Sequence, residues 1–152
     1  MRIFTFQRGR PKLAFLYLET KGPPEVSNGL ITVVDDDESM GRMLNRGLRA
    51  AGFDVAVFAS AEELLNSGHL DKSSCLIVDV HLPGMTGIQL HQRLKESGNA
   101  VPVILISGHA DEQTATRALE DGAIGFFKKP FNIERLLATI SDHLATLPST
   151  GG

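Results

Sequence analysis

Short apolar runs alternate with longer amphipathic stretches along the chain from Leu30 onward. An apolar run of about four to eight residues predicts a buried strand, and apolar residues at every third or fourth position predict a helix. Four of the five predicted strands are almost continuously apolar, which is typical of parallel strands covered on both faces. The predicted strands are Ile31–Val34, Val55–Phe58, Cys75–Asp79, Val101–Ile106 and Gly125–Lys128.

A helix is predicted after each of these strands. The first is expected to present Leu44 and Leu48 to the core and to stop at Gly52, because glycine commonly terminates helices. The second helix is predicted to begin at Ser60, which has the spacing of a capping box with Glu63. The third and fourth are predicted to span Gly87–Ser97 and Asp111–Asp121, and the fifth is predicted to begin at Asn132.

This alternation predicts an α/β fold, a doubly wound, flavodoxin-like sheet of five parallel strands with helices on both faces. Right-handed crossovers give the strand order 2-1-3-4-5. We expect this domain to cover residues 30–147, with an N-terminal extension at 1–29 and a C-terminal tail at 148–152. A chain of 152 residues is long enough to bury one sizeable core.

The N-terminal extension differs in charge from the rest of the chain. Residues 1–28 carry five Lys or Arg and two Asp or Glu, a net charge of +3, whereas ten basic and sixteen acidic residues give the remainder −6. Because nucleic-acid affinity rests largely on Lys and Arg, the acidic domain is not expected to bind nucleic acid directly. The apolar patches "IFTF" and "LAFLYL" could belong to a poorly packed extension, or could add an element to the domain or to a partner.

Composition narrows the cellular setting. No apolar run approaches the ~18 residues of a membrane span and no secretory signal is evident, so we expect a cytoplasmic protein that does not enter a membrane. Cys75 is the lone cysteine, which fits a reducing compartment, and it is predicted to be a small buried hydrophobe. The five histidines lack metal-ligand spacing and are expected at the surface rather than in a zinc site.

Polar residues follow four of the predicted strands, and parallel strands bring their carboxyl ends to one edge of the sheet. Two carboxylates ~4 Å apart repel by about 4 kcal/mol at an effective dielectric of ~20, so acids gathered there need a cation, a helix N-terminus or open water. Carboxylate oxygens with room for water suit Mg²⁺. The residues expected to meet at this edge are Asp35, Asp36, Asp79, Ser107 and Lys129.

This set of residues suits phosphoryl transfer. A carboxylate held beside a divalent ion can attack phosphorus and become an aspartyl phosphate. The reaction needs mainly positioning and neutralisation of the phosphoryl oxygens, which Mg²⁺, the ammonium of Lys129 and a donor near Ser107 can supply. Asp79, at the end of the central strand, is the best candidate for the nucleophile.

Residues 30–146 resemble a response regulator receiver domain of two-component signalling, and within that family the FixJ-type subfamily. The resemblance rests on the acidic pair after "VV", on Asp79 within "DVHLPGMTG", on Ser107 and on Lys129 in "KKPF". It implies an Mg²⁺ site formed by carboxylates and by the backbone carbonyl of His81, and a cis peptide bond between Lys129 and Pro130. The carboxylates implied as metal ligands are those of Asp35, Asp36 and Asp79.

The resemblance also implies a function, that of a signalling switch rather than an enzyme. Asp79 would accept a phosphoryl group from a histidine kinase or a phosphotransfer protein. Ser107 and Phe126 would then remodel the face made by the last two helices and the last strand, which would bind an effector or a second copy. The side chains of His81 and His109 would flank the path of water to the aspartyl phosphate.

Three other interpretations differ in how well the sequence supports them. The chain could be the receiver part of a longer DNA-binding transcription regulator, and the sequence leaves this open. An Mg²⁺-dependent phosphatase that uses an aspartyl phosphate expects a second Asp two residues after the nucleophile, where His81 stands. A dinucleotide-binding domain would need a glycine-rich turn after the first strand, where the chain has "DDDE".

The third and fourth acids of the run "DDDE", Asp37 and Glu38, are expected to stabilise the N-terminus of the first helix through its dipole.

Overall fold

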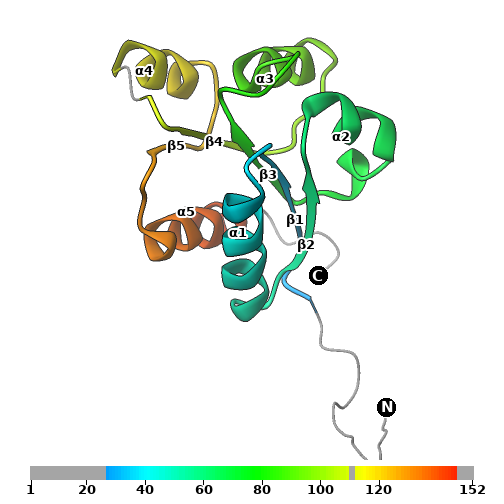
Figure 1. The fold of residues 1–152 in the computed structure, drawn as a ribbon, viewed down its shortest axis with the longest axis vertical. Helices are drawn as coiled ribbons and strands as arrows, with labels where there is room; N and C mark the ends of the chain where they lie inside the picture. The colour runs from blue at the N-terminus through cyan, green and yellow to red at the C-terminus, as the bar shows by residue number, and fades with distance from the viewer. Residues whose placement is uncertain (1–26, 110–111, 147–152) are drawn as a thin grey trace, which may run out of the picture.

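The computed structural model describes residues 27–109 and 112–146, whose strands form one parallel five-stranded sheet (Figure 1). Its strand order, β2-β1-β3-β4-β5, is the predicted one. Most of the predicted N-terminal extension and the predicted C-terminal tail lie outside the described residues. The strands are β1 (Leu30–Val34), β2 (Asp54–Phe58), β3 (Cys75–Asp79), β4 (Val103–Ser107) and β5 (Gly125–Lys128).

Helices cover both faces of the sheet, as predicted, and each face has its own apolar cluster. Helices α1 and α5 lie on one face, and α2, α3 and α4 lie on the other (Figure 1). Within the described ranges, no helix is both long and apolar enough to cross a bilayer. The helices are α1 (Glu38–Ala50), α2 (Ala61–Ser67), η1 (Leu70–Lys72, a 3₁₀ turn), α3 (Gly87–Glu96), α4 (Glu112–Glu120) and α5 (Ile133–Ala145).

Some boundaries differ from the prediction. The fourth strand begins at Val103 rather than at Val101, although the carbonyl of Pro102 already accepts a hydrogen bond from β3. At α2, Ser60 accepts from the N–H of Glu63, but the Glu63 carboxylate accepts from the residue before Ser60, so the predicted capping box is only half formed. A complete capping box stands instead at the start of α3, between Thr86 and Gln89.

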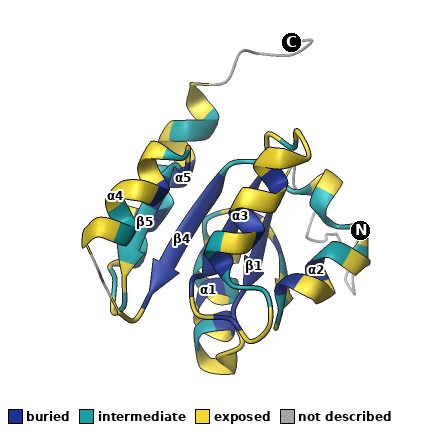
Figure 2. Ribbon diagram, turned by 90° about the horizontal axis from the view of Figure 1, so that it is seen from above, coloured by how far each residue is buried: buried dark blue, intermediate teal, exposed yellow. Residues whose placement is uncertain are grey.

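The central strands form the core. All residues of β3 and β4 are buried, whereas the helices expose their outer faces (Figure 2). Cys75 begins β3 with 1% of its surface exposed, and this burial raises the pKa of its thiol to about 12. The prediction of a packed, unreactive cysteine is therefore confirmed.

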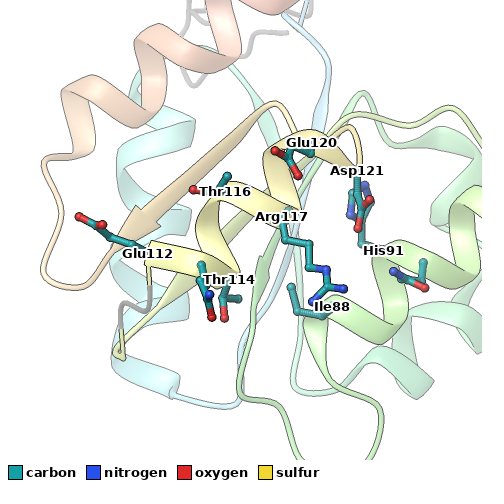
Figure 3. A pocket seen from close by; sticks show the side chains of 11 residues that line it. Ile88, His91, Glu112, Thr114, Thr116, Arg117, Glu120 and Asp121 are labelled. Carbon is teal, nitrogen blue, oxygen red and sulfur yellow. The ribbon is translucent and has the colours of Figure 1, made fainter.

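The prediction that all histidines lie at the surface is wrong for His91, which is only 6% exposed. His91 follows Leu90 on α3 and lines a groove of about 870 Å³ between α3 and α4 (Figure 3). Residues of α4 and Asp121 after it line the same groove as His91. Burial, together with the charge of Lys95, lowers the pKa of His91, and the charge of Asp121 opposes this shift.

Because the pKa of His91 is lower in the folded protein, acid should destabilise the fold through this residue. In the unfolded chain His91 takes up a proton near pH ~6.5, whereas in the folded protein it does so only at a lower pH. The contribution of neutral His91 to the free energy of unfolding is therefore complete above pH ~6.5 and is lost as the pH falls through the folded pKa. One proton changes the free energy of unfolding by at most about 1.4 kcal/mol per pH unit. Urea unfolding at pH 7.5 and 5.5 should show a smaller acid-induced loss in His91→Gln than in the parent; an equal loss would contradict this role.

Candidate functional site

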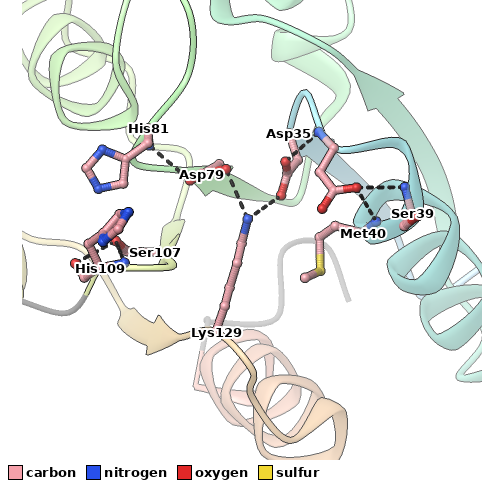
Figure 4. A network of polar contacts seen from close by, with 9 residues as sticks. Asp35, Ser39, Met40, Asp79, His81, Ser107, His109 and Lys129 are labelled. Atoms are coloured by element: carbon pink, nitrogen blue, oxygen red, sulfur yellow. Dashed lines mark hydrogen bonds and ion pairs between the residues drawn. The ribbon is translucent and has the colours of Figure 1, made fainter.

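The carboxyl ends of β1, β3, β4 and β5 place all five predicted side chains at one edge of the sheet. Figure 4 shows four of them, Asp35, Asp79, Ser107 and Lys129. The strand register aligns Asp79 with Ile106 and Ser107 with Lys128. The backbone N–H of Lys129 donates to the carbonyl of Ser107 at 2.7 Å, which fixes where the Lys129 side chain begins. The juxtaposition expected from the order of parallel strands is therefore confirmed.

Three carboxylates and one ammonium form the centre of this edge. Asp35, Asp36 and Asp79 each offer an oxygen within 4.8 Å of the others. Asp35 and Asp79 are 3% and 6% exposed, whereas Asp36 is exposed. The Nζ atom of Lys129 lies 3.1 Å from Oδ2 of Asp35 and 3.0 Å from Oδ2 of Asp79, and so bridges the two buried carboxylates.

The titration of this group reflects burial and charge together. Burial raises the pKa of Asp35, and the charge of Asp79 acts in the same direction, while hydrogen bonds from the Asp37 N–H and from Lys129 oppose it. Burial acts to lower the pKa of Lys129, but its hydrogen bonds to Asp79 and Asp35 and their charges outweigh that effect, and its pKa is raised. The ammonium is therefore retained as the partner of both acids.

The remaining two acids of the "DDDE" run serve the helix, as predicted. Asp37 is the N-cap of α1, and its carboxylate accepts from the N–H of Ser39 at 2.9 Å and from that of Met40 at 3.4 Å. Glu38 lies in the first turn of α1, where a negative charge is favourable to the helix dipole. The acidic run is thus divided between the sheet edge and a helix N-terminus.

The loop between β3 and α3 orients the Asp79 carboxylate. The N–H of His81 donates to Oδ1 of Asp79 at 2.9 Å, while Lys129 contacts Oδ2. The loop closes where the N–H of Gly87 donates to the carbonyl of Val80 at 3.0 Å. Both oxygens of Asp79 therefore have a partner that sets their direction.

Ser107 lies at the predicted place, but its hydroxyl is engaged with its own loop. The side chain is buried, donates to the carbonyl of His109 at 2.9 Å and accepts from the N–H of His109 at 3.1 Å. The ring of His109 meets the ring of His81 edge to face, with centroids 5.3 Å apart. The two histidines predicted to flank the site are thus in contact with each other.

Two further predicted features lie near β5. The peptide bond between Lys129 and Pro130 is cis, as the resemblance implied. Phe126 is half-buried and packs against the apolar cluster under α2, α3 and α4. Its side chain therefore lies in the core layer beside α4.

Sequence reasoning did not single out two residues that hold the β3–α3 loop. At Gly87 a Cβ atom would collide with the carbonyl oxygen of Asp79 and would lie 3.0 Å from the Cα of Val80. Glu62 on α2 accepts a hydrogen bond from the N–H of Met85 in the same loop. The second glycine of "GMTG", Gly87, was visible in the sequence as a sign of a tight loop. The contact between Glu62 and Met85 was not, because residues so far apart in sequence leave no local pattern.

Comparison with known proteins agrees with this geometry. The model of the response regulator receiver domain family matches residues 31–141. The chain belongs to the response regulator receiver domain family. The sequence-based resemblance and its fold are therefore confirmed.

Three related proteins illustrate the extent of the similarity. The receiver domain is 40% identical over 119 residues to the response regulator protein TodT of Pseudomonas putida, covering 78% of this chain and 52% of TodT. It is 38% identical over 114 residues to the transcriptional regulatory protein FixJ of Bradyrhizobium diazoefficiens, covering 75% of this chain and 56% of FixJ. The chain thus spans about half the length of these curated relatives.

The third is a solved structure, a response regulator protein from Burkholderia pseudomallei that holds a phosphorylated aspartic acid, a calcium ion and citrate. It is 30% identical with a TM-score of 0.66, and the match covers 78% of this chain and 72% of that one.

The close approach of Gly87 to Asp79 gives a test of how the receiver domain holds its loop. Gly87→Ala should destabilise the fold by about 1 to 3 kcal/mol, because the added methyl group must push the Asp79 backbone away. Gly108→Ala is the matched control in the β4–α4 loop, since apart from its chain neighbours no atom of the described residues lies within 4 Å of its Cβ position, and it should stay within about 0.5 kcal/mol of the parent. Urea unfolding measures both variants, and equal stabilities would exclude the collision.

Proposed function

We propose that this receiver domain is a phosphorylation-controlled switch whose phosphoacceptor is Asp79. The observation that carries the proposal is the gathering of three carboxylates and the Lys129 ammonium at the carboxyl edge of the sheet. Asp79 is the carboxylate at the end of central strand β3, with each oxygen already oriented by a donor. The phosphorylated aspartic acid of the related Burkholderia protein supports the same chemistry.

The three carboxylates fit a divalent cation of the Mg²⁺ type. Their oxygens lie within 4.8 Å of one another, and the exposure of Asp36 leaves room for water ligands. Asp35, Asp36, Asp79 and the backbone carbonyl of His81 would hold the ion. When bound, Mg²⁺ would neutralise charge on the phosphoryl oxygens.

The residues of the chain supply the remaining steps. A carboxylate oxygen of Asp79 attacks phosphorus, so that an O–P bond forms while the bond from phosphorus to the donor breaks and the donor keeps that electron pair. The Lys129 ammonium, already 3.0 Å from Asp79, donates to a phosphoryl oxygen. Ser107 turns its hydroxyl from His109 to the phosphoryl group.

The phosphoryl group would then shift the equilibrium between two conformations. A change from ~1% to ~99% active needs about 5.5 kcal/mol of differential interaction. A new charge-assisted hydrogen bond from Ser107 and a stronger pairing of Mg²⁺ and Lys129 with the phosphoryl dianion would contribute to it. Phe126 on β5 would move with Ser107 and change the face formed by α4, β5 and α5. That face would then bind an effector or a second copy.

The phosphoryl donor would be a sensor histidine kinase or a histidine phosphotransfer protein. The domain would assist its own phosphorylation and dephosphorylation but turn over no other substrate. His81 stands where an aspartyl-phosphate phosphatase expects its second carboxylate, so phosphoester hydrolysis should not be catalytic. Sustained release of phosphate from a phosphoester would instead favour the phosphatase interpretation.

Replacing the proposed phosphoacceptor tests the function directly. Incubated with acetyl phosphate and Mg²⁺, the parent should gain the mass of one phosphoryl group, and Asp79→Asn should gain none, because an amide cannot form the acyl phosphate. Circular dichroism should show the same fold in both proteins. Asp54→Asn, an exposed residue on β2, is the control and should be phosphorylated like the parent. Undiminished labelling of Asp79→Asn would place the acceptor at another residue.

A second possibility concerns the output. We propose that the domain controls transcription as the receiver part of a longer regulator, because FixJ is a transcriptional regulatory protein of which this chain matches only 56%. The complete reading frame decides between this role and a single-domain regulator, since it would show whether a DNA-binding domain is encoded with this one.

The contact between His81 and His109 leads to a prediction about the lifetime of the phosphoryl group. Two imidazoles packed edge to face beside Asp79 should obstruct the in-line approach of water. His81→Ala and His109→Ala should each speed phosphoryl loss severalfold, with little change in the rate of loading from acetyl phosphate. The decay of phosphorylated protein measures this, and slower decay in the variants would show that an imidazole acts as a base for the attacking water.

A further inference from the structure

A side chain from outside the site fixes the far end of the loop that follows Asp79. Near the site, this β3–α3 loop is anchored by the His81 N–H on Asp79 and by the Gly87 N–H on Val80. Its outer part, around Met85, lies over α2. There, the Met85 N–H donates to Oε2 of Glu62 at 2.9 Å, which joins two elements 23 residues apart.

The loop conformation is fitted to this carboxylate. Gly84 has a φ of +73°, a conformation that favours glycine, and a Cβ atom there would lie 2.8 Å from Oε2 of Glu62. The hydrogen bond from Met85 also lowers the pKa of Glu62, so the carboxylate remains charged well below neutral pH. The backbone of the loop and the Glu62 carboxylate are therefore in close contact.

Glu62 contributes little else to the fold. It lies on the exposed side of the first turn of α2, whereas the buried residues Ala61 and Leu64 hold this helix against the sheet. Loss of its carboxylate would therefore release the loop without removing a core contact.

We propose that Glu62 is a positioning residue for the phosphorylation site, acting through the β3–α3 loop. By fixing Met85, it restricts the loop so that the His81 N–H stays on Asp79 and the His81 carbonyl stays at the acidic edge. This inference rests on the proposed function for its effect on phosphorylation, while the contact between α2 and the loop stands independently of it.

Three variants separate this role from a general effect of charge or stability. Glu62→Ala removes the acceptor, and Glu62→Gln keeps a neutral one of the same length. Glu63→Ala is the matched control, because Glu63 is the next residue of the same turn, is also exposed, and its carboxylate accepts from the neighbouring backbone N–H of Ala59 rather than from the β3–α3 loop.

Hydrogen exchange of the Met85 amide, Mg²⁺ affinity by calorimetry and the rate of phosphorylation by acetyl phosphate should be measured for each variant. In Glu62→Ala we expect faster exchange at Met85, and an about three- to tenfold loss in both Mg²⁺ affinity and phosphorylation rate, the size expected when one supporting hydrogen bond is removed. Glu62→Gln should recover most of the loss, and Glu63→Ala should match the parent, with a melting temperature for all three close to that of the parent.

Two results would overturn the inference. One is Glu62→Ala with Mg²⁺ affinity and phosphorylation rate equal to those of the parent. The other is an equal loss in both variants, which would point to net charge rather than to the Met85 contact. If the parent itself takes up no phosphoryl group, the proposed function fails. In that case the hydrogen exchange of the Met85 amide and the Mg²⁺ affinity still decide whether Glu62 positions the loop.

Discussion

The bridge that Lys129 makes between Asp35 and Asp79 is the interaction on which the site depends. These carboxylates end neighbouring strands β1 and β3 and are almost completely buried, so they would repel each other strongly without a cation. β4 lies between β3 and β5, and the Lys129 side chain has to extend past its end to reach both acids. Lys129 can reach the two acids only because β3, β4 and β5 end at nearly the same level, so the strand order and register determine whether this ion-pair bridge can form.

The domain tolerates four consecutive acids because their surroundings differ. Asp35 is neutralised by Lys129, Asp36 faces solvent, and Asp37 and Glu38 lie at the N-terminus of α1. Each acid thus has a means of lowering its electrostatic cost, and of the four only Asp35 and Asp36 remain available to a cation beside Asp79. A phosphoryl group at Asp79 would bring new negative charge to the place where the ammonium already stands, so Lys129 can serve the free and the modified states alike.

Much of this arrangement follows from the sequence, and the reasons are physical. Strands buried on both faces read as continuous apolar runs, and parallel order then fixes which polar residues share an edge, so Asp79 and Lys129 could be placed together. The hydroxyl of Ser107 could not be oriented, because its partner depends on the conformation of a loop. His91 and Glu62 were missed for a related reason. His91 lines a groove together with residues of α4, Glu62 contacts the β3–α3 loop, and neither neighbour is close in sequence.

The site is suited to switching because its loops are held by few contacts, while the strands beneath them are fixed. β3 and β4 are buried throughout, so rearranging them would break the core. The loops instead depend on single hydrogen bonds, such as those of the His81 N–H with Asp79 and of the Ser107 hydroxyl with His109. The neutral bond of the Ser107 hydroxyl is worth about 1 kcal/mol net, whereas a charge-assisted bond to a phosphoryl group is roughly twice as strong. A phosphoryl group can therefore redirect the donors at this edge without disturbing the sheet that supports them, and the change would be confined to the loops and to the face of α4, β5 and α5.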